Sequence, residues 1–87
     1  MKKYSLRVSN AFERQLRRLK TQDRERAWTT IDGILQDPHS YKSLSGQLSG
    51  TRSARVGDLR IIYAIDETEK RIILLYIGHR ERVYEQQ

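Results

Sequence analysis

The sequence predicts an α+β fold in which a hairpin of two helices packs on one face of a small, mainly antiparallel sheet. Its expected order is strand, helix, helix, strand, strand, strand (β-α-α-β-β-β). The chain has 87 residues, too few for a second hydrophobic core, so we expect a single domain spanning residues 1–87. Apolar residues recur at helical spacing in the first half. In the second half they form short runs that end at turn residues, as strands do.

The first segment predicts a strand followed by a helix. Residues 4–8 alternate apolar and polar side chains, which is typical of a half-buried strand. Asn10, with Glu13 three residues later, indicates a capping box at the start of a helix. Apolar residues at spacings of four and three then give this helix one buried face: Phe12, Leu16 and Leu19.

A second helix is expected with Thr21 as its cap and with its end just before Pro38. Acidic residues in its first turn suit the positive end of the helix dipole. The short connection to the first helix predicts an antiparallel hairpin. Its apolar stripe is expected to lie in the core: Ala27, Trp28, Ile31, Ile34 and Leu35.

The remaining segment predicts a loop and three strands. Residues 39–51 are rich in Ser and Gly and are expected to form the loop. Gly57 and Asp58 form a two-residue turn with glycine first, which favours a type II′ hairpin. The last strand is the most apolar and is therefore expected at the centre of the sheet. The three strands are expected over residues 52–56, 59–65 and 71–77.

The hairpin turn determines which residues face each other across the two strands that it joins. Val56 pairs with Leu59, so Arg55 lies opposite Arg60. Like charges directly opposite each other destabilise a sheet, whereas two guanidiniums can hold a phosphate through forked hydrogen bonds. The alternative is that both arginines extend into solvent or pair with carboxylates: Asp58, Glu67 or Glu69.

The residues after the last strand bring together groups suited to phosphate chemistry. Residues 78–84 (GHRERVY) hold one imidazole, two guanidiniums and one phenol. Arginine stabilises negative charge, and tyrosine stacks on a base or moves a proton. The competing interpretation is a solvated, charged terminus with Val83 and Tyr84 packed back on the core.

The net charge favours a polyanionic partner. Seventeen Lys and Arg residues against eleven Asp and Glu give a formal charge of +6, which favours RNA, DNA or an acidic protein. The helices carry basic residues that we interpret as solvated surface able to add non-specific phosphate contacts: Arg14, Arg17, Arg18, Lys20, Arg24 and Arg26.

Composition and hydropathy exclude several other classes. The chain has no cysteine and two histidines, so we expect no disulfide, no metal site and no cofactor. The N-terminal residues lack a signal-peptide pattern, and the longest apolar run is too short to cross a bilayer. We therefore expect a soluble, cytoplasmic protein that has no membrane partner.

Three segments together resemble the RelE/ParE toxin superfamily, in particular its RelE-like branch: residues 44–46 (LSG), 55–63 (RVGDLRIIY) and 78–84 (GHRERVY). The resemblance covers nearly the whole chain, since the order of strands and helices also agrees. It implies the toxin of a type II toxin–antitoxin system, an mRNA interferase that is a ribosome-dependent endoribonuclease cutting in the ribosomal A site. The implied partners are a RelB-like antitoxin, the ribosome and mRNA. The resemblance implies no sequence-specific DNA binding by the toxin itself.

The resemblance also implies a reaction and a role for each matching residue. The 2′-hydroxyl of the message attacks the adjacent phosphate and leaves a 2′,3′-cyclic phosphate and a 5′-hydroxyl. Arg60 stabilises charge on the scissile phosphate, Arg80 holds the phosphate or assists the leaving oxygen, and Tyr84 stacks on a base or transfers a proton. Charge-stabilising donors of this kind contribute ~3–4 kcal/mol each. Phosphate contacts are expected from four further cations: Arg52, Arg55, Arg82 and Lys42.

The sequence departs from the family pattern at the strand before the hairpin turn. Well-studied members carry lysines there, one of which can act in proton transfer, whereas residues 51–56 contain arginines and no lysine. Arginine stays protonated at any working pH and cannot be a general base. Histidine titrates nearest to neutral pH, so His79 is a candidate to replace the missing lysine in proton transfer. The other candidates are Tyr84 and a ribosomal group.

Two other functions remain open at this point. A ParE-like toxin of the same fold would inhibit DNA gyrase by binding it, without cutting RNA. A catalytically inactive module of this fold would bind antitoxin or RNA only. In that case the change Arg60→Ala would leave its cellular effect unchanged.

Overall fold

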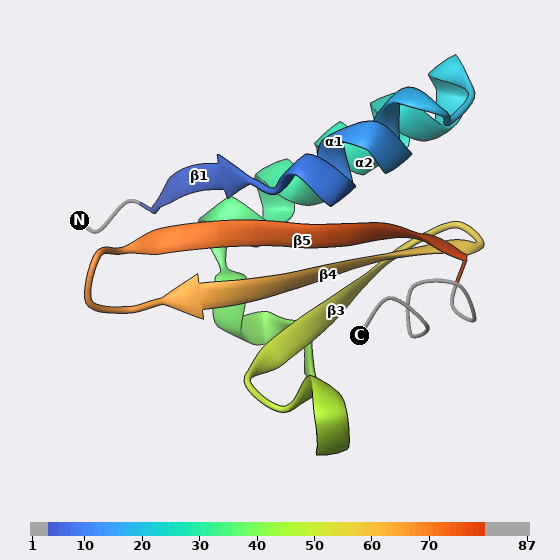
Figure 1. Ribbon diagram of the computed structural model, residues 1–87. Coiled ribbons are helices and arrows are strands. Elements are labelled where there is room, and N and C mark those ends of the chain that lie inside the picture. Colours follow the sequence, from blue (N-terminus) through green and yellow to red (C-terminus); the bar gives the residue numbers. More distant parts are fainter. Residues whose placement is uncertain (1–3, 80–87) are drawn as a thin grey trace.

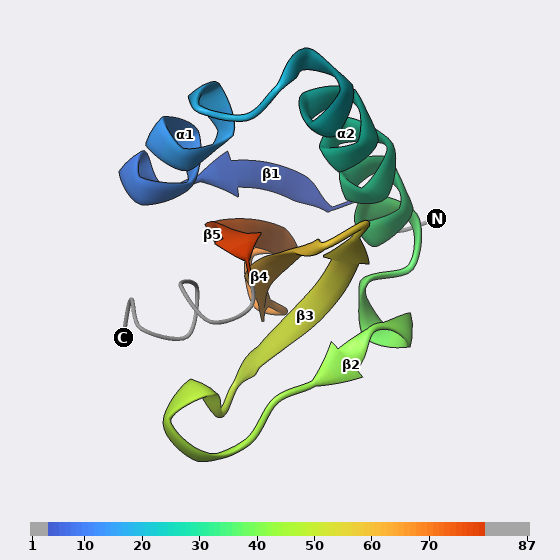
Figure 2. The ribbon, with the colours of Figure 1, turned by 90° about the vertical axis from the view of Figure 1, so that its right-hand side faces the viewer.

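The protein forms a five-stranded sheet covered on one face by two helices, as Figure 1 shows for the computed structural model, which describes residues 4–79. The helices are α1 (Asn10–Arg17) and α2 (Thr21–Gln36), and α2 is followed by the short 3-10 helices η1 (Pro38–Ser40) and η2 (Gly46–Leu48). The strands are β1 (Ser5–Val8), β2 (Lys42–Ser43), β3 (Thr51–Val56), β4 (Leu59–Asp66) and β5 (Arg71–His79). Both helices lie on the same side of the sheet, α1 against β5 and α2 against β3 (Figure 2).

The sheet confirms the predicted fold class and adds one strand to it. The strand order is β1-β5-β4-β3-β2, with β1 parallel to β5 and the other neighbours antiparallel. The segment predicted to be a loop contains β2, which pairs with the start of β3. As predicted for the most apolar strand, β5 lies inside the sheet, between β1 and β4. The unpredicted strand β2 adds a neighbour beyond β3, so β4 is the middle one of the five.

The predicted cap of each helix is one residue too late. Ser9 caps α1, because its hydroxyl oxygen accepts a 3.0 Å hydrogen bond from the Phe12 N–H. The same hydroxyl donates to the Leu75 carbonyl of β5 at 2.8 Å, which ties the helix start to the sheet. Lys20 occupies the cap position of α2 without a side-chain hydrogen bond, and α2 ends before Pro38 as predicted.

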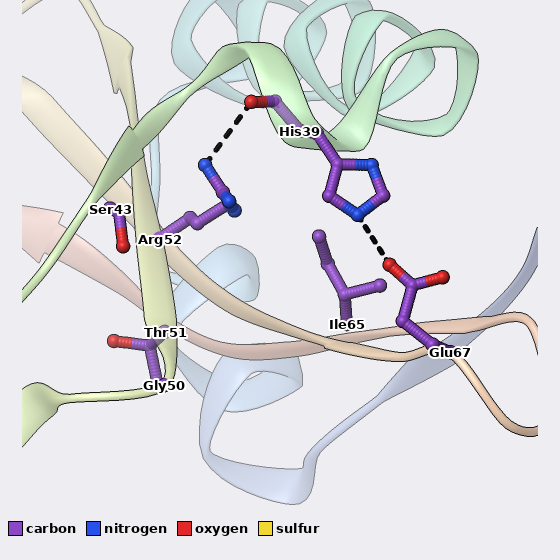
Figure 3. A pocket seen from close by; sticks show the side chains of 7 residues that line it. All are labelled: His39, Ser43, Gly50, Thr51, Arg52, Ile65 and Glu67. Carbon is purple, nitrogen blue, oxygen red and sulfur yellow. Dashed lines mark hydrogen bonds and ion pairs between the residues drawn. The ribbon is translucent and has the colours of Figure 1, made fainter.

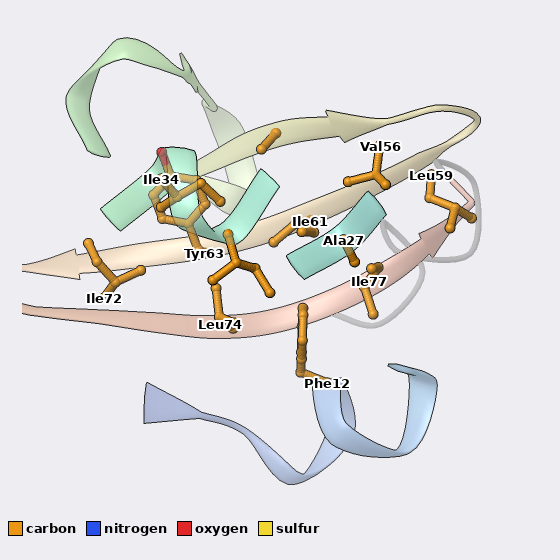
Figure 4. Packing of buried hydrophobic residues seen from close by; sticks show 12 residues of the cluster. Phe12, Ala27, Ile34, Val56, Leu59, Ile61, Tyr63, Ile72, Leu74 and Ile77 are labelled. Carbon is orange, nitrogen blue, oxygen red and sulfur yellow. The ribbon is translucent and has the colours of Figure 1, made fainter. Parts of the chain in front are cut away.

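One buried cluster joins both helices to three strands (Figure 4). Helix α2 contributes residues at spacings of four and three, the pattern of a helix with one buried face. The cluster consists of Phe12, Ala27, Ile31, Ile34, Ala54, Val56, Leu59, Ile61, Tyr63, Ile72, Leu74 and Ile77.

Trp28 is not part of this cluster, and its predicted place in the core was wrong. Its side chain is 44% exposed, because it follows Ala27 and is rotated by about 100° away from the buried face of α2. Trp28 instead lines an apolar groove between the helices, together with Leu16 and the partly exposed Val8. Within residues 4–79, no helix is long and apolar enough to span a bilayer.

The hairpin between β3 and β4 has the predicted register. Val56 pairs with Leu59 and Arg55 with Arg60. Gly57 has φ +59°, and Lys70 is the one described non-glycine residue with positive φ. The φ of Asp58 is therefore negative, which is the combination that a type II′ turn requires.

Candidate functional site

Arg55 and Arg60 lie side by side on the face of the sheet opposite α1 and α2. Leu59 and Ile61 belong to the core beneath the helices, so the alternation of side chains along β4 turns Arg60 to the opposite face. Arg55 is its partner on β3, and Gly78 is its partner on β5. Because glycine has no side chain, β5 places none beside Arg60 at this register position.

Lys42 joins the two arginines on the same face. The next row across the sheet runs from Lys42 on β2 through Ser53 on β3 and Ile62 on β4 to Tyr76 on β5. Ser53 lies two positions before Arg55 on β3, so both point to the face opposite α1 and α2, and the exposed Lys42 beside Ser53 shares that face. The structure thus brings together three of the cations that the sequence singled out.

Within residues 4–79, neither Arg55 nor Arg60 forms an ion pair. In the described part of the chain, Glu67 pairs with His39 and Lys70, and Glu69 lies 4.0 Å from Arg71. No ion pair within residues 4–79 involves Arg55 or Arg60, so the pairing with carboxylates considered from the sequence is not seen there. Two facing guanidiniums without a carboxylate between them favour a shared anion, which relieves their repulsion.

Arg52 and His79 are placed away from this pair. Arg52 Nη1 donates to the carbonyl oxygens of Tyr41 at 2.7 Å and His39 at 3.2 Å, and so anchors the connection after α2 to β3. His79 pairs with Leu59, whose side chain is in the core, and this register places His79 on the helix side of the sheet. Their predicted roles stay predictions, and the remaining predicted residues lie outside the described range: Arg80, Arg82 and Tyr84.

A second polar cluster lies at the opposite end of the sheet, around Glu67. Glu67 lies beside His39 (Figure 3). Both line a cavity of about 200 Å³, together with Arg52. The carboxylate accepts hydrogen bonds from Lys70 Nζ and the Tyr4 hydroxyl, each at 3.1 Å, and it contacts His39 Nε2. These contacts join the start of β1, η1 and the β4–β5 turn. No group of three metal-ligating side chains occurs among the described residues.

The hydrogen bonds to Glu67 make stability depend on pH. The Lys70 ammonium, followed by His39 and Tyr4, holds the pKa of the Glu67 carboxyl below its ordinary value of 4.5. A lowered pKa in the folded state stabilises the fold above 4.5, and this contribution is lost as the pH falls through the folded pKa. We therefore expect the Tm of the wild type to fall more steeply below pH 4.5 than that of Glu67→Gln, as measured by circular dichroism.

Glu25 on α2 provides the matched control for this measurement. It is exposed, and its carboxylate makes no ion pair with a described residue. The change Glu25→Gln should keep the wild-type dependence of Tm on pH. An equally steep loss in Glu67→Gln would show that other carboxyls cause the acid transition.

Comparison with known proteins agrees with this architecture. The family model described as ParE toxin of type II toxin-antitoxin system, parDE, matches residues 6–84. The toxin RelE of Mycobacterium tuberculosis is 40% identical over 52 residues, which are 59% of this chain and 54% of that protein. The chain spans about half the length of the curated relatives it matches.

Two solved toxin–antitoxin complexes are similar in structure. The complex RelBE2 from Mycobacterium tuberculosis is 28% identical with a TM-score of 0.82, over 92% of this chain and 94% of the other. The intact Escherichia coli RelBE complex shares the fold at 16% identity, with a TM-score of 0.79 over 91% and 99% of the two chains. The family match covers most of the chain, including both helices and nearly all of the sheet. The chain therefore belongs to the ParE toxin family of type II toxin–antitoxin systems, within the RelE/ParE superfamily.

Proposed function

We propose that this toxin is a ribosome-dependent endoribonuclease that cleaves messenger RNA in the A site. The observation that carries the proposal is the facing pair of Arg55 and Arg60 on the side of the sheet opposite α1 and α2. Such a pair is costly in a sheet unless it serves to hold an anion. A phosphodiester is the anion that a planar, forked guanidinium fits.

The geometry supports a simple division of roles in the cleavage. The 2′-hydroxyl oxygen attacks the adjacent phosphorus, and the bond from phosphorus to the 5′-oxygen breaks. The products are a 2′,3′-cyclic phosphate and a 5′-hydroxyl, so one proton leaves the 2′-hydroxyl and one reaches the leaving oxygen. Arg60 stabilises the charge that builds on the phosphate, and Arg55 and Lys42 hold the backbone beside it. Arg80 and Arg82 add positive charge from the segment after β5.

The proton acceptor is a group other than the two facing arginines, because a guanidinium does not give up its proton at working pH. The register of β5 places His79 on the side of the sheet that faces the helices. We therefore favour Tyr84 or a ribosomal group over His79 as the proton acceptor. The leaving oxygen needs a proton donor, and the Lys42 ammonium, which holds the backbone on the same face, is a candidate for this second role.

The proposed partners follow from the charge and the relatives. Two relatives of known structure are described as toxin–antitoxin complexes. We propose that a RelB-like antitoxin with an acidic or amphipathic segment covers the arginine face of this toxin, and that the toxin acts on ribosomes in the cytoplasm. Weakened antitoxin binding by Arg60→Glu would support this placement, and unchanged binding would contradict it.

The test is induced expression of the wild type beside Arg60→Ala/Arg80→Ala, followed by mapping of messenger RNA 5′ ends. We expect cuts inside translated codons with the wild type and none with the double variant. Growth arrest without such cuts would overturn the nuclease proposal.

A second candidate function has the family match in its favour, because the matching model bears the name ParE. A toxin of that kind would bind DNA gyrase and block supercoiling without cutting RNA. Purified toxin assayed on relaxed plasmid with gyrase separates the two candidates. Inhibition of supercoiling at concentrations that cut no message would favour gyrase.

A further inference from the structure

Arg26 of α2 lies against the tip of the β3–β4 hairpin. A Cβ atom placed on Gly57 would be 3.6 Å from Arg26 Nη1. The position of α2 explains this contact, because the neighbouring Ala27 is fully buried in the same cluster as Val56 and Leu59, which flank the turn (Figure 4). Packing of Ala27 thus holds the base of the Arg26 side chain beside the turn.

The hairpin tip therefore has guanidiniums on both sides. Arg26 comes from the helix layer, whereas Arg55 and Arg60 occupy the opposite face of the same two strands. Arg26 is exposed, and none of the ion pairs within residues 4–79 includes it. Gly57 has no side chain, so the Arg26 guanidinium lies directly beside the turn backbone.

We propose that Arg26 forms a second phosphate subsite, which holds the RNA backbone where it passes across the hairpin tip. One phosphate lies on Arg55 and Arg60, and another phosphate of the same strand lies on Arg26. A guanidinium that contacts phosphate reads no base, so this subsite adds affinity without codon preference. The inference rests on the proposed function, because it takes RNA as the ligand of the arginine face.

A remote phosphate contact and a contact to the reacting phosphate have different kinetic signatures. The remote contact binds the ground state and the transition state alike, so its loss weakens binding and leaves the maximal rate unchanged. Loss of Arg60, which acts on the reacting phosphate, lowers the maximal rate instead. Arg26 is therefore a positioning residue whose effect is separable from that of Arg60.

The experiment measures single-turnover cleavage on ribosomes programmed with a short message, with increasing toxin concentration. We expect Arg26→Gln to raise the concentration for half-maximal rate about five- to tenfold, an effect typical of losing one solvent-exposed hydrogen bond. The maximal rate should stay unchanged, and Arg26→Lys should restore part of the affinity. The control is Arg7→Gln, since Arg7 is exposed on β1 and pairs with Ile73 at the end of the sheet away from the hairpin tip.

A second measurement keeps the inference testable without cleavage. Binding to a single-stranded RNA oligonucleotide with 2′-O-methyl sugars is followed by fluorescence anisotropy over a range of salt concentrations. Affinity falls with salt, and the magnitude of the slope of log affinity against log salt should be smaller by about 1 in Arg26→Gln, as expected for one lost phosphate contact. The change should be smaller in Arg7→Gln.

The outcomes separate the two proposals. A wild type that cuts no message overturns the nuclease function, and the salt slopes alone then decide the role of Arg26. If the wild type cuts message but Arg26→Gln and Arg7→Gln behave alike in both measurements, the subsite is overturned. The nuclease function then still stands. A reduced maximal rate in Arg26→Gln also overturns the subsite, because it would place Arg26 in the chemical step.

Discussion

Replacing Arg60 by alanine is expected to lower the single-turnover rate of message cleavage on ribosomes about 10²–10³-fold, the usual effect of removing one charge-stabilising donor. Arg60 is the half-buried member of the facing pair, and its partner on β5 is Gly78, which has no side chain. The lost guanidinium would otherwise neutralise charge that builds as the phosphate is attacked. Quenched-flow sampling with primer extension on the cut message measures this rate.

The controls for this variant address charge and folding separately. Arg7→Ala removes the same charge from β1 and should keep the wild-type rate. The Tm of Arg60→Ala should stay close to that of the wild type, because no ion pair of Arg60 within residues 4–79 is lost. A cleavage rate within fivefold of the wild type would remove Arg60 from the reaction.

Replacing Phe12 by alanine is expected to cost about 3–5 kcal/mol of the free energy of unfolding. Phe12 is fully buried and is the residue through which α1 enters the core. Small domains have a total stability of about 5–15 kcal/mol, so the variant should lose much of its stability. Urea unfolding followed by circular dichroism measures the difference.

Trp28→Ala is the matched control for an aromatic residue that the sequence also assigned to the core. Because 44% of Trp28 is exposed, its replacement should cost less than that of the fully buried Phe12. Equal losses in the two variants would contradict the placement of Trp28 in the groove between the helices.

The parts of the fold that were predictable depend on neighbouring residues. The turn at Gly57 has a positive φ that glycine adopts readily, and a two-residue turn leaves one register for the strands beside it. That register by itself places Arg55 opposite Arg60, because each residue is one position away from the pair that closes the turn. The fold class followed in the same way, from the spacing of apolar residues.

The parts that were not predictable depend on residues distant in sequence. Ser9 is the cap of α1 because its hydroxyl also reaches β5. The short strand β2 exists because β3 offers it a free edge, and it places Lys42 on the arginine face. The position of Arg26 beside Gly57 depends on how α2 packs on the sheet, which no spacing in the sequence encodes.

The parallel pairing of β1 with β5 bears on when the sheet of this toxin can close during synthesis. Ser5 pairs with Arg71 and Val8 with Leu74, so the first strand has no partner until β5 has been synthesised. Pairings between segments so distant in sequence form slowly in folding. We therefore expect β1 to join the sheet only after β5 has left the ribosome.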